Sequence, residues 1–370
     1  MRPVLFGLFA IVLTACVDRS VNPIVPEALE VGAPYTVFVA SSRAREPDGT
    51  YGFRRSDRLN LLELTVSIPP AHQPGELNFS YANPDPERQF ALAGQREFAS
   101  QHDFNARVAQ KLRGFDPKNR EVVIFVHGYN TTQVETAFRA AQMAHDVDIP
   151  GQLMMYSWPS RGRAYGYAYD LDSMLFARDG LESFVRQVKA AGAKRVVLVA
   201  HSMGSALTME MLRQAELKNP GWARRTFAGV ILISPDLDID LFREQMGEIT
   251  DVPQPFAILV SEKDKALGFS ARLRGTADSE RLGNISSIQK IADLPVEVID
   301  TTAFSDDAAS SHFVAATSPS LLAMFRAVRP LQRAIEPDRL AVEALFPASG
   351  RTGSGASSVT LRGPLSGDER

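Results

Sequence analysis

Ser202 lies in the segment RVVLVAHSMGSALTMEML, where an apolar strand ends at Ala200 and a helical stretch begins near Gly204. The pattern is G-x-S-x-G with Ala200 in place of the first glycine. Small residues on both sides of the serine allow a sharp turn that lifts its hydroxyl above the edge of a sheet. The N-terminus of the following helix favours negative charge that develops beside it. This strand–turn–helix context predicts Ser202 as a nucleophile.

A serine hydroxyl is a weak nucleophile at neutral pH, so it needs a histidine base and a carboxylate that orients the base. In the fold that carries this turn, the chain order is serine, acid, histidine. His312, in SDDAASSHFV, is the only histidine after Ser202 and is the predicted base. Two aspartates follow later strands, Asp264 in ILVSEKDKAL and Asp236 in ILISPDLD. We predict Asp264 as the acid because it ends the second strand beyond the nucleophile, and Asp236 is the alternative.

The segment VVIFVHGYNTT places a glycine turn at the end of another strand. An acyl-transfer site needs two N–H donors for the developing oxyanion, one after the nucleophile and one from an earlier strand–helix loop. We assign these donors to the backbones of Met203 and Tyr129, with Gly128 as the alternative to Tyr129. His127 is interpreted as an orienting residue and not as the base.

The segment WPSRGRAYGYAYDLD follows a strand on the same side of the predicted sheet. Trp158, Tyr165 and Tyr167 are the predicted substrate-binding residues, and the alternating tyrosines would share one side if the segment were extended. Only 22 residues separate Ile233 from Phe256. That length allows one short helix and no large cap domain, so we expect an open site.

Short apolar strands alternate with helical stretches from residue 121 onward, which predicts a mostly parallel sheet with helices on both faces. The predicted strands are 35–40, 61–68, 122–126, 153–156, 196–200, 230–233, 256–260 and 296–299. The predicted helices are 98–112, 134–144, 171–191, 205–217, 239–246 and 320–327.

The N-terminal stretch from Val4 to Ala15 is apolar and has the length of a signal-peptide core. It closes on Leu-Thr-Ala-Cys, and the sole cysteine, Cys16, stands where the lipobox of bacterial lipoproteins carries its lipidated residue. This resemblance implies a protein of the bacterial cell envelope, anchored to a membrane by lipid at the periplasmic face or in the outer membrane. We expect a signal peptide at 1–15, a tether at 16–34, one domain at 35–330, an extension at 331–347 and a disordered tail at 348–370.

Composition excludes several classes of protein. Apolar residues make up 45% and charged residues 22% of the chain, which is typical of a globular protein. A net charge of −3 lacks the basic excess of a nucleic-acid binder, so no nucleic-acid partner is expected. No cofactor is expected, because the sequence contains no P-loop. No metal is expected, because no His or Cys pair has ligand spacing.

In this order, HGYNTT, YSWPSRG, AHSMGS, SPDLD and a late SHF resemble a bacterial family of α/β-hydrolases in the esterase/lipase superfamily. The likeness covers roughly residues 35–328 and includes VSIPPAHQPGEL. It implies an α/β-hydrolase fold and a Ser-Asp-His triad, and it supplies no substrate. We expect a serine hydrolase that cleaves carboxylic esters. The alternatives are a thioesterase, an acyltransferase, an amidase or a non-catalytic envelope binding module.

Overall fold

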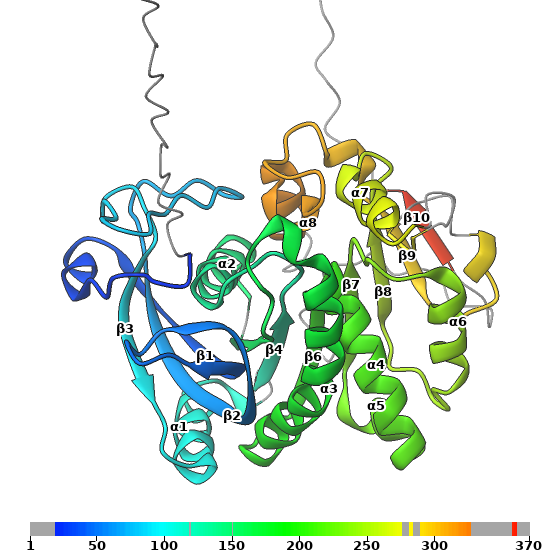
Figure 1. The fold of residues 1–370 in the computed structure, drawn as a ribbon, viewed down its shortest axis with the longest axis horizontal. Helices are drawn as coiled ribbons and strands as arrows, with labels where there is room; N and C mark the ends of the chain where they lie inside the picture. The colour runs from blue at the N-terminus through cyan, green and yellow to red at the C-terminus, as the bar shows by residue number, and fades with distance from the viewer. Residues whose placement is uncertain are drawn as a thin grey trace, which may run out of the picture.

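The computed structural model describes residues 19–117, 120–149, 151–275, 281–283, 289–326 and 357–360. The strands of this part form one sheet in the order β10-β9-β8-β7-β6-β4-β5-β1-β2-β3. All neighbouring pairs are parallel except β1–β2 and β2–β3, so β2 alone runs against the other described strands. In Figure 1 the β1–β3 end of the sheet lies opposite the β9–β10 end, with helices packed between them.

The strands are β1 (Ala33–Arg45), β2 (Tyr51–Ile68), β3 (Ala91–Glu97), β4 (Glu121–Val126), β5 (Gln152–Ser157), β6 (Arg195–His201), β7 (Gly229–Ile233), β8 (Phe256–Val260), β9 (Glu297–Asp300) and β10 (Ser357–Thr360). The α-helices are α1 (Gln101–Arg113), α2 (Gln133–Val147), α3 (Tyr167–Ala190), α4 (Met203–Lys218), α5 (Trp222–Thr226), α6 (Ile239–Gly247), α7 (Lys265–Leu273) and α8 (Val314–Thr317). Short 3-10 helices cover Pro26–Glu30, Ala164–Gly166 and Thr302–Phe304. Residues 319–326 are also helical.

Alternate side chains of the central strands belong to two separate cores, one on each face of the sheet. On β4, Val122, Ile124 and Val126 pack into the first core, and Val123 and Phe125 into the second. The first core also holds the apolar faces of α1, α3, α4 and α6, and the second holds those of α2 and α8. This arrangement explains why the central strands read as continuous apolar runs, since both of their faces are buried.

All eight predicted strands are present, and the parallel α/β architecture is confirmed. A single short helix, α6, joins β7 to β8, as the spacing predicted. The sequence did not predict β3, α7 or β10. The β10 strand corrects part of the expected disordered tail, because residues 357–360 pair in parallel with β9. Backbone pairing joins this segment to the edge of the sheet, and Val359 packs against the second core.

The expected tether at 16–34 is also corrected over its described residues, which lie against the domain. Ile24 forms a bridge with Leu92, and Ala28 is fully buried. Arg19 donates to the backbone oxygens of Asn130 and Gly162. Polar, proline-rich sequence therefore packs here through side-chain and backbone hydrogen bonds.

The expected signal peptide at 1–15, Cys16 and the expected extension at 331–347 lie outside the described residues. Within the described part, no helix combines the length and apolar character needed to cross a membrane.

Candidate active site

Ser202 stands on a strained turn between β6 and α4. Its backbone has φ 53° and ψ −124°, a conformation that costs a non-glycine residue about 1–3 kcal/mol. The turn packs closely against the end of β4. A Cβ on Gly204 would lie 2.4 Å from the His127 carbonyl oxygen, and one on Gly128 would lie 2.9 Å from the Ser202 Cβ. The two glycines thus let the β4 loop and the nucleophile turn approach each other.

The structure brings Ser202, His312 and Asp264 together from three separate segments. The Ser202 Oγ lies 2.8 Å from His312 Nε2, and His312 Nδ1 lies 2.7 Å from Asp264 Oδ2. The Asp264 side chain is 1% exposed and that of His312 is 21% exposed. The other oxygen of Asp264, Oδ1, accepts the Ala266 and Leu267 amides and so caps α7. The helix start therefore fixes the carboxylate that holds the imidazole.

Asp236, the alternative acid, belongs to a separate buried network, and the carboxylate that holds His312 is that of Asp264. Its Oδ2 accepts the Tyr167 hydroxyl at 2.7 Å, and its Oδ1 accepts the Ser270 hydroxyl at 2.8 Å. The Arg281 side chain lies 3.5 Å away. Both carboxylate oxygens are therefore used in fastening α3 and α7 beside the nucleophile turn.

His201 contacts the loop that carries His312 and holds its backbone. His201 donates its Nε2–H to the His312 carbonyl at 3.0 Å, and its ring stacks on Phe313 at 3.9 Å. Burial, with a smaller effect from His312, lowers the pKa of His201 well below its usual value. The Arg139 guanidinium lies 5.5 Å from the centre of the Phe313 ring and donates to the Ala316 carbonyl. His201 thus positions the backbone of His312 and does not contact the Ser202 hydroxyl.

The predicted oxyanion donors lie at the same edge of the sheet. Met203 is the first residue of α4, so helix hydrogen bonding does not use its N–H. Tyr129 follows Gly128 in the β4 loop, and its hydroxyl donates to the Ala164 carbonyl. Next in this loop, Asn130 has a positive φ of 58° and accepts two hydrogen bonds from Arg19. The loop is therefore held from two sides.

His127 is buried inside a structural network. Its Nδ1–H donates to the Gly128 carbonyl at 2.8 Å, and its Nε2 accepts the Trp158 N–H at 3.2 Å. Burial, together with the neighbouring Arg43 guanidinium, lowers the pKa of His127 to about 3. Arg43 is itself fully buried and donates to Ser157, Gly52, Ser160 and Thr131. These contacts fix the loops after β4 and β5 relative to each other. They agree with an orienting role for His127.

Two of the predicted substrate-binding residues are buried, which is a correction. Trp158 has no exposed surface and stacks on His127 at 5.0 Å. Tyr167 is 6% exposed, and its hydroxyl donates to Asp236 and accepts from Arg274. Tyr165 is exposed and pairs with Arg163. The tyrosines do not share one side, because the segment forms a 3-10 turn and the start of α3 instead of an extended strand.

A family model described as "Alpha/beta hydrolase of unknown function (DUF900)" matches residues 96–329, more than half of the chain. The chain belongs to this family. This α/β-hydrolase carries the parallel sheet and the serine turn of its fold, and its strands β4, β6 and β8 deliver the predicted site to one edge. A search of curated proteins gives no match.

Solved structures that resemble this α/β-hydrolase are distant. A YdeN-like hydrolase from Pectobacterium atrosepticum is 14% identical, with 65% of this chain and 100% of that chain covered, at a TM-score of 0.30. A lipase-esterase related protein from Clostridium acetobutylicum is 10% identical, with 60% and 96% covered, at a TM-score of 0.30. Likenesses at this level carry no information about the substrate.

The sequence did not single out Arg19, Arg43 or His201 as supports of the site. Arg43 and Arg19 reach the β4 loop from more than eighty residues away in the chain. No local pattern signals such contacts. A signal did exist for His201, because a histidine beside the nucleophile must place its ring somewhere on the tight turn.

Proposed function

We propose that this protein is a serine hydrolase that cleaves carboxylic esters through an acyl-enzyme on Ser202. The observation that carries the proposal is the continuous hydrogen-bond chain from Ser202 Oγ through His312 to Asp264. Three side chains that lie 48 to 110 residues apart meet at the edge of the sheet where the strained turn presents the hydroxyl. A structural serine needs neither the strained backbone nor the imidazole.

Each group has a role in the proposed reaction. His312 Nε2 takes the proton of the Ser202 hydroxyl as the oxygen attacks the ester carbonyl, and later gives that proton to the leaving alcohol. Asp264 holds the Nδ1–H and stabilises the imidazolium. The backbone N–H groups of Met203 and Tyr129 receive the oxyanion. Water, activated by the same imidazole, then releases the acid from Ser202.

The surroundings of the site favour an acyl substrate. A cavity of about 260 Å³ reaches Gly128 and His201, which adjoin Ser202, and is lined by aromatic rings that include Phe79 and Phe313. The charged members of its lining include Arg19 and Glu135, which form a salt bridge at 2.8 Å. We assign the acyl part of the ester to the apolar side of this cavity, which Leu77, Phe79, Phe125 and Phe313 line.

Labelling with a fluorophosphonate tests this function, with hydrolysis of p-nitrophenyl esters of graded chain length measured beside it. The wild type is expected to be labelled and to hydrolyse the esters, and Ser202→Ala is expected to lose both. Ser205→Ala is the matched control, because the hydroxyl of Ser205, in α4, donates to the Ala200 carbonyl of β6 and contacts no member of the proposed triad. A wild type that is neither labelled nor active would favour the non-catalytic binding module.

The same three residues also serve thioesterases, acyltransferases and amidases. A parallel panel of thioesters and anilides, with an added alcohol acceptor in one arm, separates these reactions by the product formed. We expect the ester arm to give the highest kcat/KM. A higher kcat/KM for thioesters or anilides would change the reaction class and leave the role of Ser202 intact.

We further propose that Cys16 carries a lipid that anchors the protein to a membrane of the cell envelope. The wild type is expected to incorporate labelled palmitate and to fractionate with membranes. Cys16→Ser is expected to lose the label, because this chain has no other cysteine. Equal label on both proteins would overturn the anchor. Ser202→Ala should keep the label, which separates anchoring from catalysis.

A further inference from the structure

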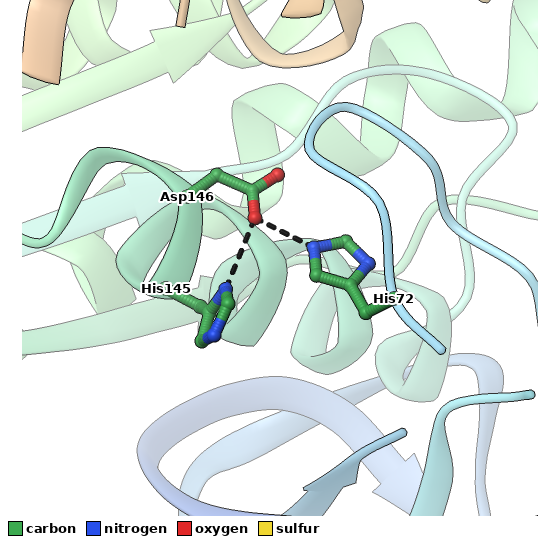
Figure 2. A group of neighbouring side chains, drawn as sticks. All are labelled: His72, His145 and Asp146. Atoms are coloured by element: carbon green, nitrogen blue, oxygen red, sulfur yellow. Dashed lines mark hydrogen bonds and ion pairs between the residues drawn. The ribbon is translucent and has the colours of Figure 1, made fainter. Parts of the chain in front are cut away.

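Two histidines and an aspartate gather on the face of the sheet covered by α2, away from the Ser202 hydroxyl. His145 and Asp146 lie in the last turn of α2, and His72 lies in the loop after β2 (Figure 2). His72 Nε2 lies 2.6 Å from Asp146 Oδ1, and His145 Nδ1 lies 3.2 Å from the same oxygen. Both imidazoles thus direct a nitrogen at one carboxylate oxygen.

The second oxygen of Asp146 is fully engaged elsewhere. Asp146 Oδ2 accepts the Gly75 N–H at 2.8 Å and the Gln142 side-chain amide at 2.5 Å. These bonds fix the plane of the carboxylate and leave Oδ1 facing the two rings. Hydrogen bonds that orient a coordinating carboxylate in this way are a regular part of protein metal sites.

Burial is uneven across the three groups. The side chains of Asp146 and His72 are 0% and 4% exposed, and that of His145 is 46% exposed. The buried pair supplies the desolvated half of a site. His145 supplies the half that is open to solvent, from which an ion and a coordinating water can arrive.

We propose that His72 Nε2, His145 Nδ1 and Asp146 Oδ1 bind one divalent first-row transition-metal ion, with zinc as the best match. Two imidazole nitrogens and one carboxylate oxygen are ligands that zinc prefers, and a water completes a tetrahedron. The three atoms lie within 4.8 Å of one another. Ligands of one tetrahedral zinc lie about 3.3 Å apart, given bonds of about 2.0–2.1 Å. The His72–Asp146 contact of 2.6 Å would have to lengthen by about 0.7 Å, and the two imidazole nitrogens, which lie within 4.8 Å of each other, would have to settle near the same spacing.

Coordination would fasten the loop of His72 to α2 and, through it, to α8. A Cβ on Gly75 would lie 2.7 Å from the Thr317 carbonyl oxygen, so this loop touches the last residue of α8 directly. Gln142 also bridges Asp146 to the Ala316 carbonyl, at 3.1 Å. The site is therefore a structural clamp behind the segment that follows His312, and its existence does not depend on ester hydrolysis.

Zinc titration of the whole chain tests the proposal. Protein stripped with a chelator is titrated with zinc chloride in a calorimeter, and thermal melting is recorded with and without zinc. The wild type is expected to bind one equivalent and to melt at a higher temperature when loaded. His145→Gln should weaken binding at least tenfold, because glutamine keeps a donor for Asp146 but is a poor zinc ligand. His72→Gln should do the same.

Two controls separate this site from other histidines. His102→Gln, on the exposed face of α1, should bind as the wild type does. His312→Gln should also retain the site, because its imidazole belongs to the other Asp–His pair. The proposal is overturned if zinc does not bind, if His145→Gln binds as tightly as the wild type, or if only His312→Gln loses binding.

Discussion

The molecule contains two buried carboxylates that each hold an imidazole at nearly the same distance. His312 lies 2.7 Å from Asp264, and His72 lies 2.6 Å from Asp146. The two pairs differ in the third group that each of them contacts. The second nitrogen of His312 faces the Ser202 hydroxyl, whereas the oxygen of Asp146 that holds His72 also faces the second imidazole, that of His145. The same buried Asp–His pair thus occurs both beside a hydroxyl and beside a second imidazole, and we propose that this third group decides its chemistry.

The two carboxylates also differ in the other hydrogen bonds that they accept. Asp264 uses its free oxygen to cap α7, which leaves the imidazole as the one ring it holds. Burial opposes ionisation of Asp146, but hydrogen bonds from His145, His72, Gln142 and Gly75 outweigh it and lower the pKa of Asp146. Four groups donate hydrogen bonds to the Asp146 carboxylate, two of them imidazoles. The Asp264 carboxylate holds a single imidazole, that of His312.

The largest expected effect comes from removing the charge of each aspartate in turn. Asp264→Asn should lower kcat about 10⁴-fold with little change in KM, by analogy with serine proteases, because the imidazole loses its orientation and its counter-charge. Asp146→Asn should leave kcat within about tenfold and lower the melting temperature, because its carboxylate contacts neither Ser202 nor His312. Steady-state kinetics and thermal melting check both.

Asp236→Asn is the matched variant at the alternative acid. It should disturb the Tyr167 and Ser270 contacts and so cost stability more than turnover. A large loss of kcat in Asp236→Asn beside a small loss in Asp264→Asn would reverse the assignment of the acid. A large loss in Asp146→Asn would show that the comparison between the two pairs is wrong.

A smaller effect is expected where the Ser202 turn depends on close approach of the β4 loop. Gly128→Ala places a Cβ 2.8 Å from His201 Nδ1 and 2.9 Å from the Ser202 Cβ. Relief of that overlap should cost about 1–3 kcal/mol of stability and should lower kcat by displacing the turn. Gly247→Ala, where a Cβ meets nothing within 4 Å, is the control. Equal kcat in the two variants would show that the turn tolerates the displacement.

The last effect concerns pH and His127, a buried histidine that belongs to neither pair. The pKa of His127 falls to about 3 in the folded chain and is about 6.5 when unfolded. Between these values the unfolded chain binds the extra proton, so stability falls as pH falls, by about 1.4 kcal/mol per pH unit. Urea unfolding between pH 7 and pH 4 should show a shallower dependence in His127→Gln than in the wild type. His102→Gln, with an exposed ring, should match the wild type.

Much of the fold could be predicted because the central strands are buried on both faces. Runs such as VVIFV and VVLVA report that burial directly, and the alternation with helices then implies a parallel sheet. Edge elements lack this signal. The β3 strand reads ALAGQRE and β10 reads SSVT, and neither has an apolar run that distinguishes a strand from a loop. Backbone pairing with a neighbour forms these edge strands.

The residues of the candidate site also differ in how far the sequence alone could identify them. Ser202, Asp264 and His312 each follow a strand in a fixed chain order, so local sequence and order were enough to select them. Trp158 and Tyr167 were misassigned because an aromatic residue near a strand end has the same local pattern whether it packs or lines a pocket. His72 and Asp146 lie 74 residues apart, and only the fold brings them into contact.

Arg19 has a consequence for the position of a membrane surface. Its guanidinium binds the backbone oxygens of Asn130 and Gly162, beside the loop that carries Tyr129. In the sequence, three residue steps separate Cys16 from Arg19, and such a length of chain spans at most about 11 Å. A lipid on Cys16 would therefore hold the edge of the sheet that bears Ser202 close to the bilayer surface. Esters dissolved in that bilayer would then reach Ser202 by lateral diffusion instead of through bulk water.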